Sequence, residues 1–311
     1  RSLGYLEDLE KQYADPIKHF EAVVAKMNEE EALENQPVTI SFDPKETLTE
    51  SAPNRKNIGY AALSKLYHML NLDTFFYNNA RSFKSEFNTN NIMKLLIFSR
   101  ILEPASKKKT YENKDRYFEN TDFSLDDIYR CLTQIIPAKD RLQLHLHRQM
   151  KAKFGRSTEL VHYDVTNYYF EIDKQDEMRR KGVSKEHRPD PIVQMGLLMD
   201  TQGIPIMYDL FPGNTNDCNT LMPILNKMKK NYEIGRTIVV ADKGINTADN
   251  IAVNILQGNG YMFSQTVRGG NKELKDYVLD QSGYRQISEG YKIKSRLYPR
   301  EIAVSNIEGG R

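Results

Sequence analysis

Two aspartates stand where apolar strands are predicted to reach the surface. Asp242 directly follows the apolar run 237–241, and Asp164 lies in the apolar segment 160–165. A carboxylate on an apolar strand is costly to bury without a partner, and a bound divalent cation offsets that cost. The residue types therefore predict an oxygen-liganded site for Mg²⁺ or Mn²⁺.

Two such carboxylates support phosphoryl-transfer chemistry. Hard divalent ions are commonly held by one or two carboxylates together with phosphate oxygens and water. Two ions roughly 3.5–4 Å apart activate an attacking oxygen and stabilise the leaving oxygen during displacement at phosphorus. In this hypothesis Asp164 bridges the ions and Asp242 is the second ligand. For either residue alone a salt-bridged or capping aspartate is the simpler explanation, but the two together favour the metal site.

The segments around both acids alternate with period 2, which predicts strands. We expect three strands, a helix, a strand, a second helix and a last strand, at residues 159–170, 192–200, 204–211, 217–230, 236–242, 247–256 and 261–267. Asn216 or Asp217 is expected to cap the first of these helices. This is the order of an α/β protein with a mixed sheet and the ribonuclease H-like fold, in which the fourth strand lies beside the first. The acids 164 and 242 should then meet at one end of the sheet.

Composition narrows the class of protein. With 39% hydrophobic residues among 311 the chain can form a sizeable core, and its net charge of +2 neither requires nor excludes a polyanionic partner. Cys131 and Cys218 lack C-x-x-C spacing, which argues against a disulfide scaffold or zinc site and fits a reducing cytoplasm. No apolar run approaches the roughly 20 residues that span a bilayer. The chain starts at Arg1 without a Met, so we expect a piece of a longer protein.

Three motifs make the prediction specific. Residues 163–170 read YDVTNYYF, residues 210–215 read LFPGNT, and residues 239–244 read VVADKG. These segments resemble insertion-sequence transposases of the DDE type, in the group with a β-rich insertion before the final catalytic Glu. The resemblance implies metal-dependent cleavage at transposon ends and strand transfer into target DNA. It also implies that Asp164 and Asp242 are the first two catalytic acids.

The same resemblance implies partners and leaves one residue unassigned. The partners would be double-stranded DNA, as terminal inverted repeats and target, and a second copy of the chain on paired ends. The location would be the bacterial cytoplasm, at the nucleoid. The third acid has no match before Arg311, and Glu301 and Glu308 lie in unsuitable contexts.

Four regions follow from these patterns. Residues 1–56 are expected to form an N-terminal helix and linker, and residues 57–154 a helical DNA-binding domain with helices at 58–70, 91–102, 124–134 and 138–153. Residues 155–267 would be the catalytic core. Residues 268–311 would begin the β-rich insertion, with a helix at 272–279 and strands at 291–297 and 300–304.

Several basic residues are candidates for phosphate contact. They lie in the helical region, in the loop between the first two strands, beside the second acid and in the insertion: Lys107, Lys108, Lys109, Lys185, Arg188, Lys243, Lys294 and Arg296. Solvated surface charge is the ordinary explanation for each. His162, two residues before Asp164, shares its strand face and is a candidate phosphate neighbour or a sheet histidine with ordinary partners.

Other functions stay open at this point. A DNA-binding remnant without an active site, or another ribonuclease H-like nuclease, would share these features. Residues 242–247 could instead form the phosphate turn of a sugar-kinase or actin-like fold, although glycine-rich phosphate loops are missing elsewhere. A haloacid-type phosphatase would need a second Asp two residues after Asp164, where Thr166 stands.

Overall fold

The structure is a computed structural model that describes residues 9–13, 15–34, 55–185 and 187–297. The chain divides into two compact units, Arg1–Lys139 and Asp140–Arg311. The predicted strand 300–304, Glu301 and Glu308 lie outside the described residues. None of the described helices is long and apolar enough to cross a membrane.

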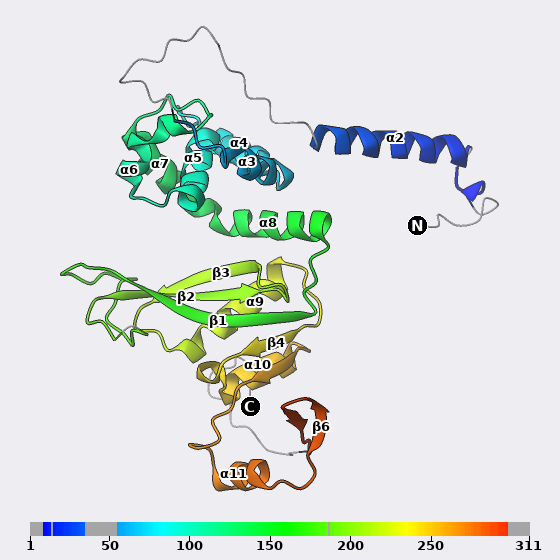
Figure 1. The fold of residues 1–311 in the computed structure, drawn as a ribbon, viewed down its shortest axis with the longest axis vertical. Coiled ribbons are helices and arrows are strands. Elements are labelled where there is room, and N and C mark those ends of the chain that lie inside the picture. Colours follow the sequence, from blue (N-terminus) through cyan, green and yellow to red (C-terminus); the bar gives the residue numbers. More distant parts are fainter. Residues whose placement is uncertain (1–8, 14, 35–54, 186, 298–311) are drawn as a thin grey trace. The chain divides into compact units, whose positions relative to one another are not determined.

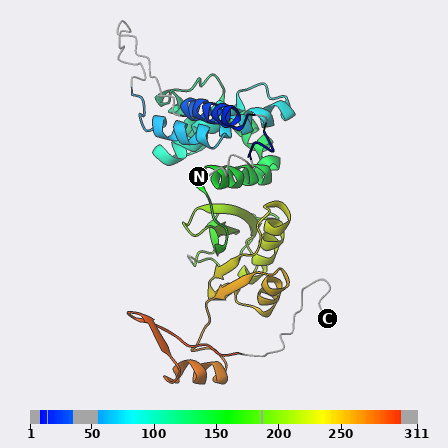
Figure 2. The same ribbon diagram turned by 90° about the vertical axis from the view of Figure 1, so that its right-hand side faces the viewer.

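The first unit is helical. Its elements are α2 (Pro16–Glu34), α3 (Tyr60–Met69), α4 (Leu72–Phe83), α5 (Thr89–Leu102), α6 (Lys107–Glu112), η1 (Lys114–Arg116), α7 (Leu125–Ile135) and η2 (Ile136–Ala138). Figure 2 shows α3 to α7 in cyan and blue-green as a group of short helices. The predicted helices at 58–70, 91–102 and 124–134 are confirmed, whereas α4 was not predicted. Its aromatic and asparagine-rich sequence has weak helix propensity, and burial of Phe76 stabilises it instead.

Two features give this helical unit its stability. Phe76, Ile92, Leu95 and Phe98 are almost fully buried, and burial of each side chain contributes about 2 kcal/mol. At the start of α7 the Ser124 hydroxyl accepts a hydrogen bond from the backbone amide of Asp127. The Asp127 carboxylate in turn accepts one from the Ser124 amide. This capping box is the helix start that the sequence indicates.

The second unit contains a five-stranded mixed sheet. Its elements are α8 (Lys139–Phe154), β1 (Leu160–Tyr169), β2 (Ile192–Met199), β3 (Pro205–Pro212), η3 (Asp217–Asn219), α9 (Leu221–Asn231), β4 (Ile238–Ala241), η4 (Lys243–Ile245), α10 (Ala248–Leu256) and β5 (Gly260–Phe263). The strand order is β3-β2-β1-β4-β5 (Figure 1). β1 and β2, and β2 and β3, are antiparallel, while β4 is parallel to both β1 and β5. The predicted fold and the contact between the first and fourth strands are therefore confirmed.

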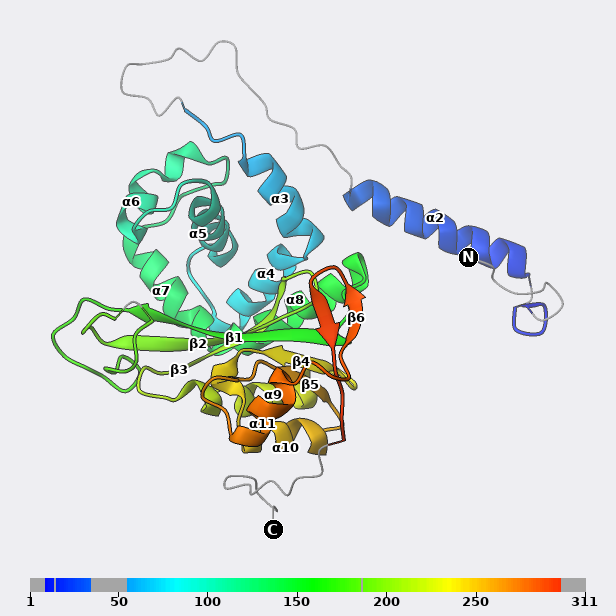
Figure 3. The same ribbon diagram turned by 60° about the horizontal axis from the view of Figure 1, so that its bottom comes forward.

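Helices α9 and α10 cover one face of this sheet, as Figure 3 shows. The hydrophobic core between these helices and the sheet includes Val161, Tyr163 and Val165 of β1, so alternate residues of that strand are buried. The Tyr163 hydroxyl donates to the Thr220 hydroxyl at 2.6 Å, just before α9. The expected cap at Asn216 or Asp217 is wrong for α9, because a 3-10 turn precedes the helix and Thr220 is its N-cap.

Helix α8 belongs to the sheet unit. The division between units falls at Lys139/Asp140, whereas the sequence pattern placed a boundary after Phe154. Gln143 accepts a hydrogen bond from the backbone amide of Tyr208 in β3 at 2.6 Å. The buried His147 ring packs edge-on against Tyr232. These contacts explain why the last helix of the helical region groups with the sheet.

The segment after β5 carries α11 (Lys272–Leu279) and a two-stranded antiparallel pair, β6 (Arg285–Ser288) and β7 (Tyr291–Ile293) (Figure 2). The helix 272–279 is confirmed, and the strand predicted at 291–297 ends at Ile293. β6 was not predicted because its residues are mostly polar and all exposed, which leaves no period-2 pattern of apolar residues.

Candidate active site

Asp164 and Asp242 stand at equivalent positions of two neighbouring strands. β1 and β4 run parallel in a register that pairs Tyr163 with Ala241, the residues immediately before the two acids. Tyr163 and Ala241 are buried under α9 and α10, and side chains alternate along a strand, so both carboxylates project from the opposite face. Neighbouring strands lie about 4.8 Å apart. The fold therefore brings two acids from distant parts of the sequence side by side.

Both carboxylates are exposed and keep one oxygen free of protein contacts. Oδ1 of Asp164 accepts a hydrogen bond from the Val165 amide at 2.8 Å and lies 3.8 Å from Nζ of Lys185. Oδ1 of Asp242 accepts one from the Lys243 amide at 2.7 Å and so caps the turn η4. In the described part of the chain no donor contacts Oδ2 of either residue. Those oxygens are open to a cation from solvent.

The loop that carries Lys185 is held against the sheet by close backbone packing. The Gly213 amide donates to the carbonyl of Met178 at 3.1 Å. A Cβ on Gly213 would lie 2.1 Å from a carbonyl oxygen of β2, and a Cβ on Gly182 would lie 1.8 Å from the Gly213 oxygen. Only glycine allows this approach at either position. Lys185 in turn donates to the Val165 carbonyl, which fixes its ammonium beside Asp164.

The other basic candidates of the sheet unit have different surroundings. The Arg188 guanidinium lies 4.0 Å from the centre of the Tyr169 ring and 3.8 Å from Glu171. Lys243 is exposed, and no acidic side chain of the described residues pairs with it. His162 is half-buried on the same face as Asp164 and has no hydrogen-bond partner among the described groups. Lys243 therefore leaves a positive charge next to Asp242, and His162 leaves an open polar group on the face of Asp164.

Lys294 and Arg296 serve the insertion itself. Nζ of Lys294 donates to the carbonyl oxygens of Tyr277 and Asp280 at 2.9 and 3.0 Å, and its side chain is only 9% exposed. Arg296 stacks over the Tyr277 ring at 4.2 Å and pairs with Glu273 at 3.1 Å. Most of the Lys294 side chain is therefore buried within the insertion. The Lys294 ammonium neutralises the carbonyl end of α11, and DNA contact by Lys294 or Arg296 stays a prediction.

The basic run of the helical unit is also partly used within the fold. Lys109 pairs with Glu112 at 3.2 Å, and Ser106 caps α6. The neighbouring Lys114 donates to two backbone carbonyls at 2.7 and 3.2 Å. Lys107 and Lys108 are exposed and have no acidic partner in the part that the structure describes. DNA contact by all three lysines stays a prediction, with Lys107 and Lys108 as the stronger candidates of the run.

The donor set is compatible with a hard divalent cation but is small. Two carboxylates with free oxygens can hold Mg²⁺ or Mn²⁺ when substrate phosphate and water complete the shell. Among the described residues there is no group of three or more His, Cys, Asp or Glu side chains arranged to hold a metal ion. The fit depends on Asp164 and Asp242, and the structure assigns no third acid.

The strand order, with two antiparallel pairs followed by two parallel pairs, and the paired acids define a ribonuclease H-like domain. Residues 169–302 match the family model described as "Transposase DDE domain". This part of the chain is therefore similar to transposase DDE domains. The match includes Asp242 and begins at the last residue of β1, five positions after Asp164. No curated protein matches the chain.

Solved transposase–DNA complexes show a distant similarity. The Mos1 transposase paired-end complex with the left transposon end is 12% identical, covers 57% of this chain and 59% of that chain, and has a TM-score of 0.25. The piggyBac transposase synaptic complex with hairpin DNA is 10% identical, covers 75% of this chain and 55% of that chain, and has a TM-score of 0.39. The chain thus spans less than two thirds of these structures, and at such scores the strand order carries the fold assignment.

Proposed function

We propose that this chain is the catalytic part of a DNA transposase that cleaves transposon ends and joins them to target DNA. The observation that carries the proposal is the register of β1 and β4, which places Asp164 and Asp242 next to each other on one face. The match of residues 169–302 to a transposase domain supports DNA as the substrate class.

In this proposal the two aspartates hold Mg²⁺ or Mn²⁺ through their free oxygens. When bound, such a cation polarises a phosphate and activates an attacking hydroxyl or water. The strands of the sheet fix both carboxylates before substrate binds, which lowers the entropy cost of assembling the site. Lys185, 3.8 Å from Asp164, and Lys243, next to Asp242, supply positive charge for the DNA backbone. The third acid stays unassigned.

The proposal extends to partners and location. Arg188 and the exposed Lys107 and Lys108 are proposed to contact double-stranded DNA, as terminal repeat or target, and to contribute to a binding constant that falls with salt. We also propose a homodimer on paired ends in the bacterial cytoplasm, since a transposase must hold two ends together to join them.

Calorimetric titration with Mn²⁺ tests the metal site. We expect the wild-type chain to bind Mn²⁺ and Asp164→Asn or Asp242→Asn to bind at least about tenfold more weakly, which corresponds to about 1.4 kcal/mol. Asp173→Asn is the matched control, because this exposed acid lies in the loop after β1. Equal Mn²⁺ binding by all four proteins would refute the metal site.

Duplex binding in a gel-shift titration separates the alternatives. A transposase should bind DNA. The fraction of DNA bound should change when Mn²⁺ is added to the wild type, but not when it is added to Asp242→Asn. A DNA-binding remnant should bind DNA equally in both proteins with no metal effect. Stabilisation by a nucleotide without DNA binding would instead support the kinase-like reading.

A further inference from the structure

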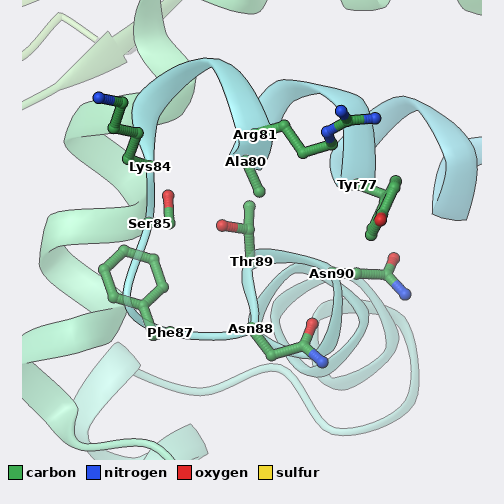
Figure 4. A pocket seen from close by; sticks show the side chains of 9 residues that line it. All are labelled: Tyr77, Ala80, Arg81, Lys84, Ser85, Phe87, Asn88, Thr89 and Asn90. Atoms are coloured by element: carbon green, nitrogen blue, oxygen red, sulfur yellow. The ribbon is translucent and has the colours of Figure 1, made fainter.

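A cavity in the helical unit lies between the end of α4 and the start of α5, with a volume of about 310 Å³. Figure 4 shows the side chains that surround it. They are Tyr77, Ala80, Arg81, Lys84, Ser85, Phe87, Asn88, Thr89 and Asn90. None of them is acidic, and two are cationic. The cavity belongs to neither the metal site nor the basic candidates that the sequence suggested.

The charges around this cavity have one sign. Arg81 and Lys84 are exposed, and neither has an acidic partner in the described part of the chain. The 14-residue helix α5 begins at Thr89, so the positive end of its dipole faces the cavity. The Asn88 side chain accepts from the Asn91 amide at 3.0 Å, which leaves the amides of Thr89 and Asn90 without a described acceptor. Free amides at a helix start are donors for an anion.

The Thr89 hydroxyl gives an independent indication of a ligand. Thr89 is 2% exposed, and its Oγ1 has no hydrogen-bond partner among the described groups. A buried hydroxyl without a partner costs about 1–3 kcal/mol. In Figure 4 the Thr89 side chain lies inside the ring of lining residues, between Ala80 and Asn88. A ligand that accepts a hydrogen bond from Oγ1 would remove this cost.

We propose that this cavity binds a phosphate group. The phosphate oxygens would accept hydrogen bonds from the Thr89 hydroxyl and the first amides of α5, and Arg81 and Lys84 would neutralise its charge. Helix starts and basic side chains are common phosphate contacts in DNA complexes, where they set the position of the protein on the duplex. Resting on the proposed function, we assign the phosphate to the DNA backbone and the helical unit to DNA positioning.

Titration with inorganic phosphate, followed by amide NMR of the whole chain, tests the cavity without any role for Asp164 or Asp242. We expect saturable shifts of the Thr89 and Asn90 amides, lost in the double variant Arg81→Gln/Lys84→Gln. Arg100→Gln is the matched control, because Arg100 is an exposed cation at the opposite end of α5. Absence of saturable shifts, or identical shifts in the double variant, would overturn the proposal.

Thr89→Val separates ligand binding from a structural role of the hydroxyl. This variant should be at least as stable as the wild type, because it removes a buried group without a partner, yet it should bind phosphate about tenfold more weakly. Lower stability together with unchanged phosphate affinity would contradict the assignment of Thr89.

Duplex binding then distinguishes the two sources of phosphate. If the site holds the DNA backbone, the double variant should lower the slope of log affinity against log salt by roughly 1 for one phosphate contact, while Arg100→Gln leaves it unchanged. Phosphate binding with an unchanged DNA slope would overturn the assignment to DNA and leave a site for free phosphate. Failure of the wild-type chain to bind Mn²⁺ would contradict the proposed metal site at Asp164 and would leave the phosphate site of the helical unit unaffected.

Discussion

Replacing Asp242 with Asn should change stability in opposite directions with and without metal. Without metal, Asp164 and Asp242 are two negative charges at the ends of paired segments of adjacent strands, and adjacent strands lie about 5 Å apart. At this distance their repulsion in water is about 0.8 kcal/mol, and both side chains are exposed enough for this limit to apply. Asn keeps the oxygen that caps η4, so the substitution removes charge without removing the cap.

The expected shifts follow from these values. Relief of the repulsion should raise the melting temperature of the metal-free protein by roughly 1–3 °C, for a unit of the size of Asp140–Arg311. In contrast, Mn²⁺ at 100 times its dissociation constant should stabilise the wild type by about 2.7 kcal/mol. Asp242→Asn should lose most of that gain, because one of two ligands is gone.

Thermal unfolding followed by circular dichroism, in EDTA and in Mn²⁺, measures both effects. Asp173→Asn controls for the general effect of removing an exposed acid, and should shift neither curve. A lower melting temperature of Asp242→Asn in EDTA, or a full response to Mn²⁺, would show that the two carboxylates do not share a site.

Two further substitutions and one pH titration test what stabilises the sheet unit. Gly213→Ala should destabilise the chain by about 1–3 kcal/mol and weaken Mn²⁺-dependent DNA binding, because a Cβ would lie 2.1 and 2.3 Å from backbone oxygens. Arg156→Met should cost about 3–5 kcal/mol in urea unfolding, because Asp200 is 5% exposed and would lose its ion pair at 2.9 Å. Burial lowers the pKa of His147 to about 4, so the unfolded chain binds more protons below pH 6.5. The free energy of unfolding should therefore decrease as the pH is lowered from 6.5 to 4, by up to about 1.4 kcal/mol per pH unit.

Each of these results has a control. Gly235→Ala places a Cβ in open space and should be nearly neutral, so equal effects at 213 and 235 would contradict the packing argument. Arg156→Met combined with Asp200→Asn should recover part of the lost stability, because no buried charge is left unpaired. His147→Gln should flatten the pH dependence, and an unchanged slope would show that another group titrates.

The sequence determined the order of elements in the sheet unit. In β1 the buried residues Val161, Tyr163 and Val165 alternate with more exposed ones, so its period-2 pattern is visible in the sequence. β2 has no exposed residue, and its apolar sequence and the turn after it indicate a strand instead. The short connection between the predicted strands 192–200 and 204–211 contains Gly203, and the structure gives this residue a φ of +77° that favours glycine. Local preference failed for α4, where burial of Phe76 overrides weak helix propensity.

The candidate active site also has a part that could be predicted from the sequence and a part that could not. Asp164 and Asp242 could be singled out because an acid at the end of an apolar run is visible in the sequence, and the strand order predicted their meeting. The sequence could not predict which basic side chains have partners inside the fold. Lys294 and Lys185 are both lysines in predicted surface segments, and only the structure shows what each ammonium contacts. The cavity at Thr89 likewise depends on two helices meeting.

The strand pattern, the fold class and the two candidate acids could thus be predicted before folding is considered, because they depend on side-chain periodicity and residue type. Tertiary structure alone decided which charges are neutralised inside the fold, where glycine permits backbone contact and where a buried hydroxyl lacks a partner. Those properties depend on distances between segments remote in the chain, and such distances exist only once the chain is folded.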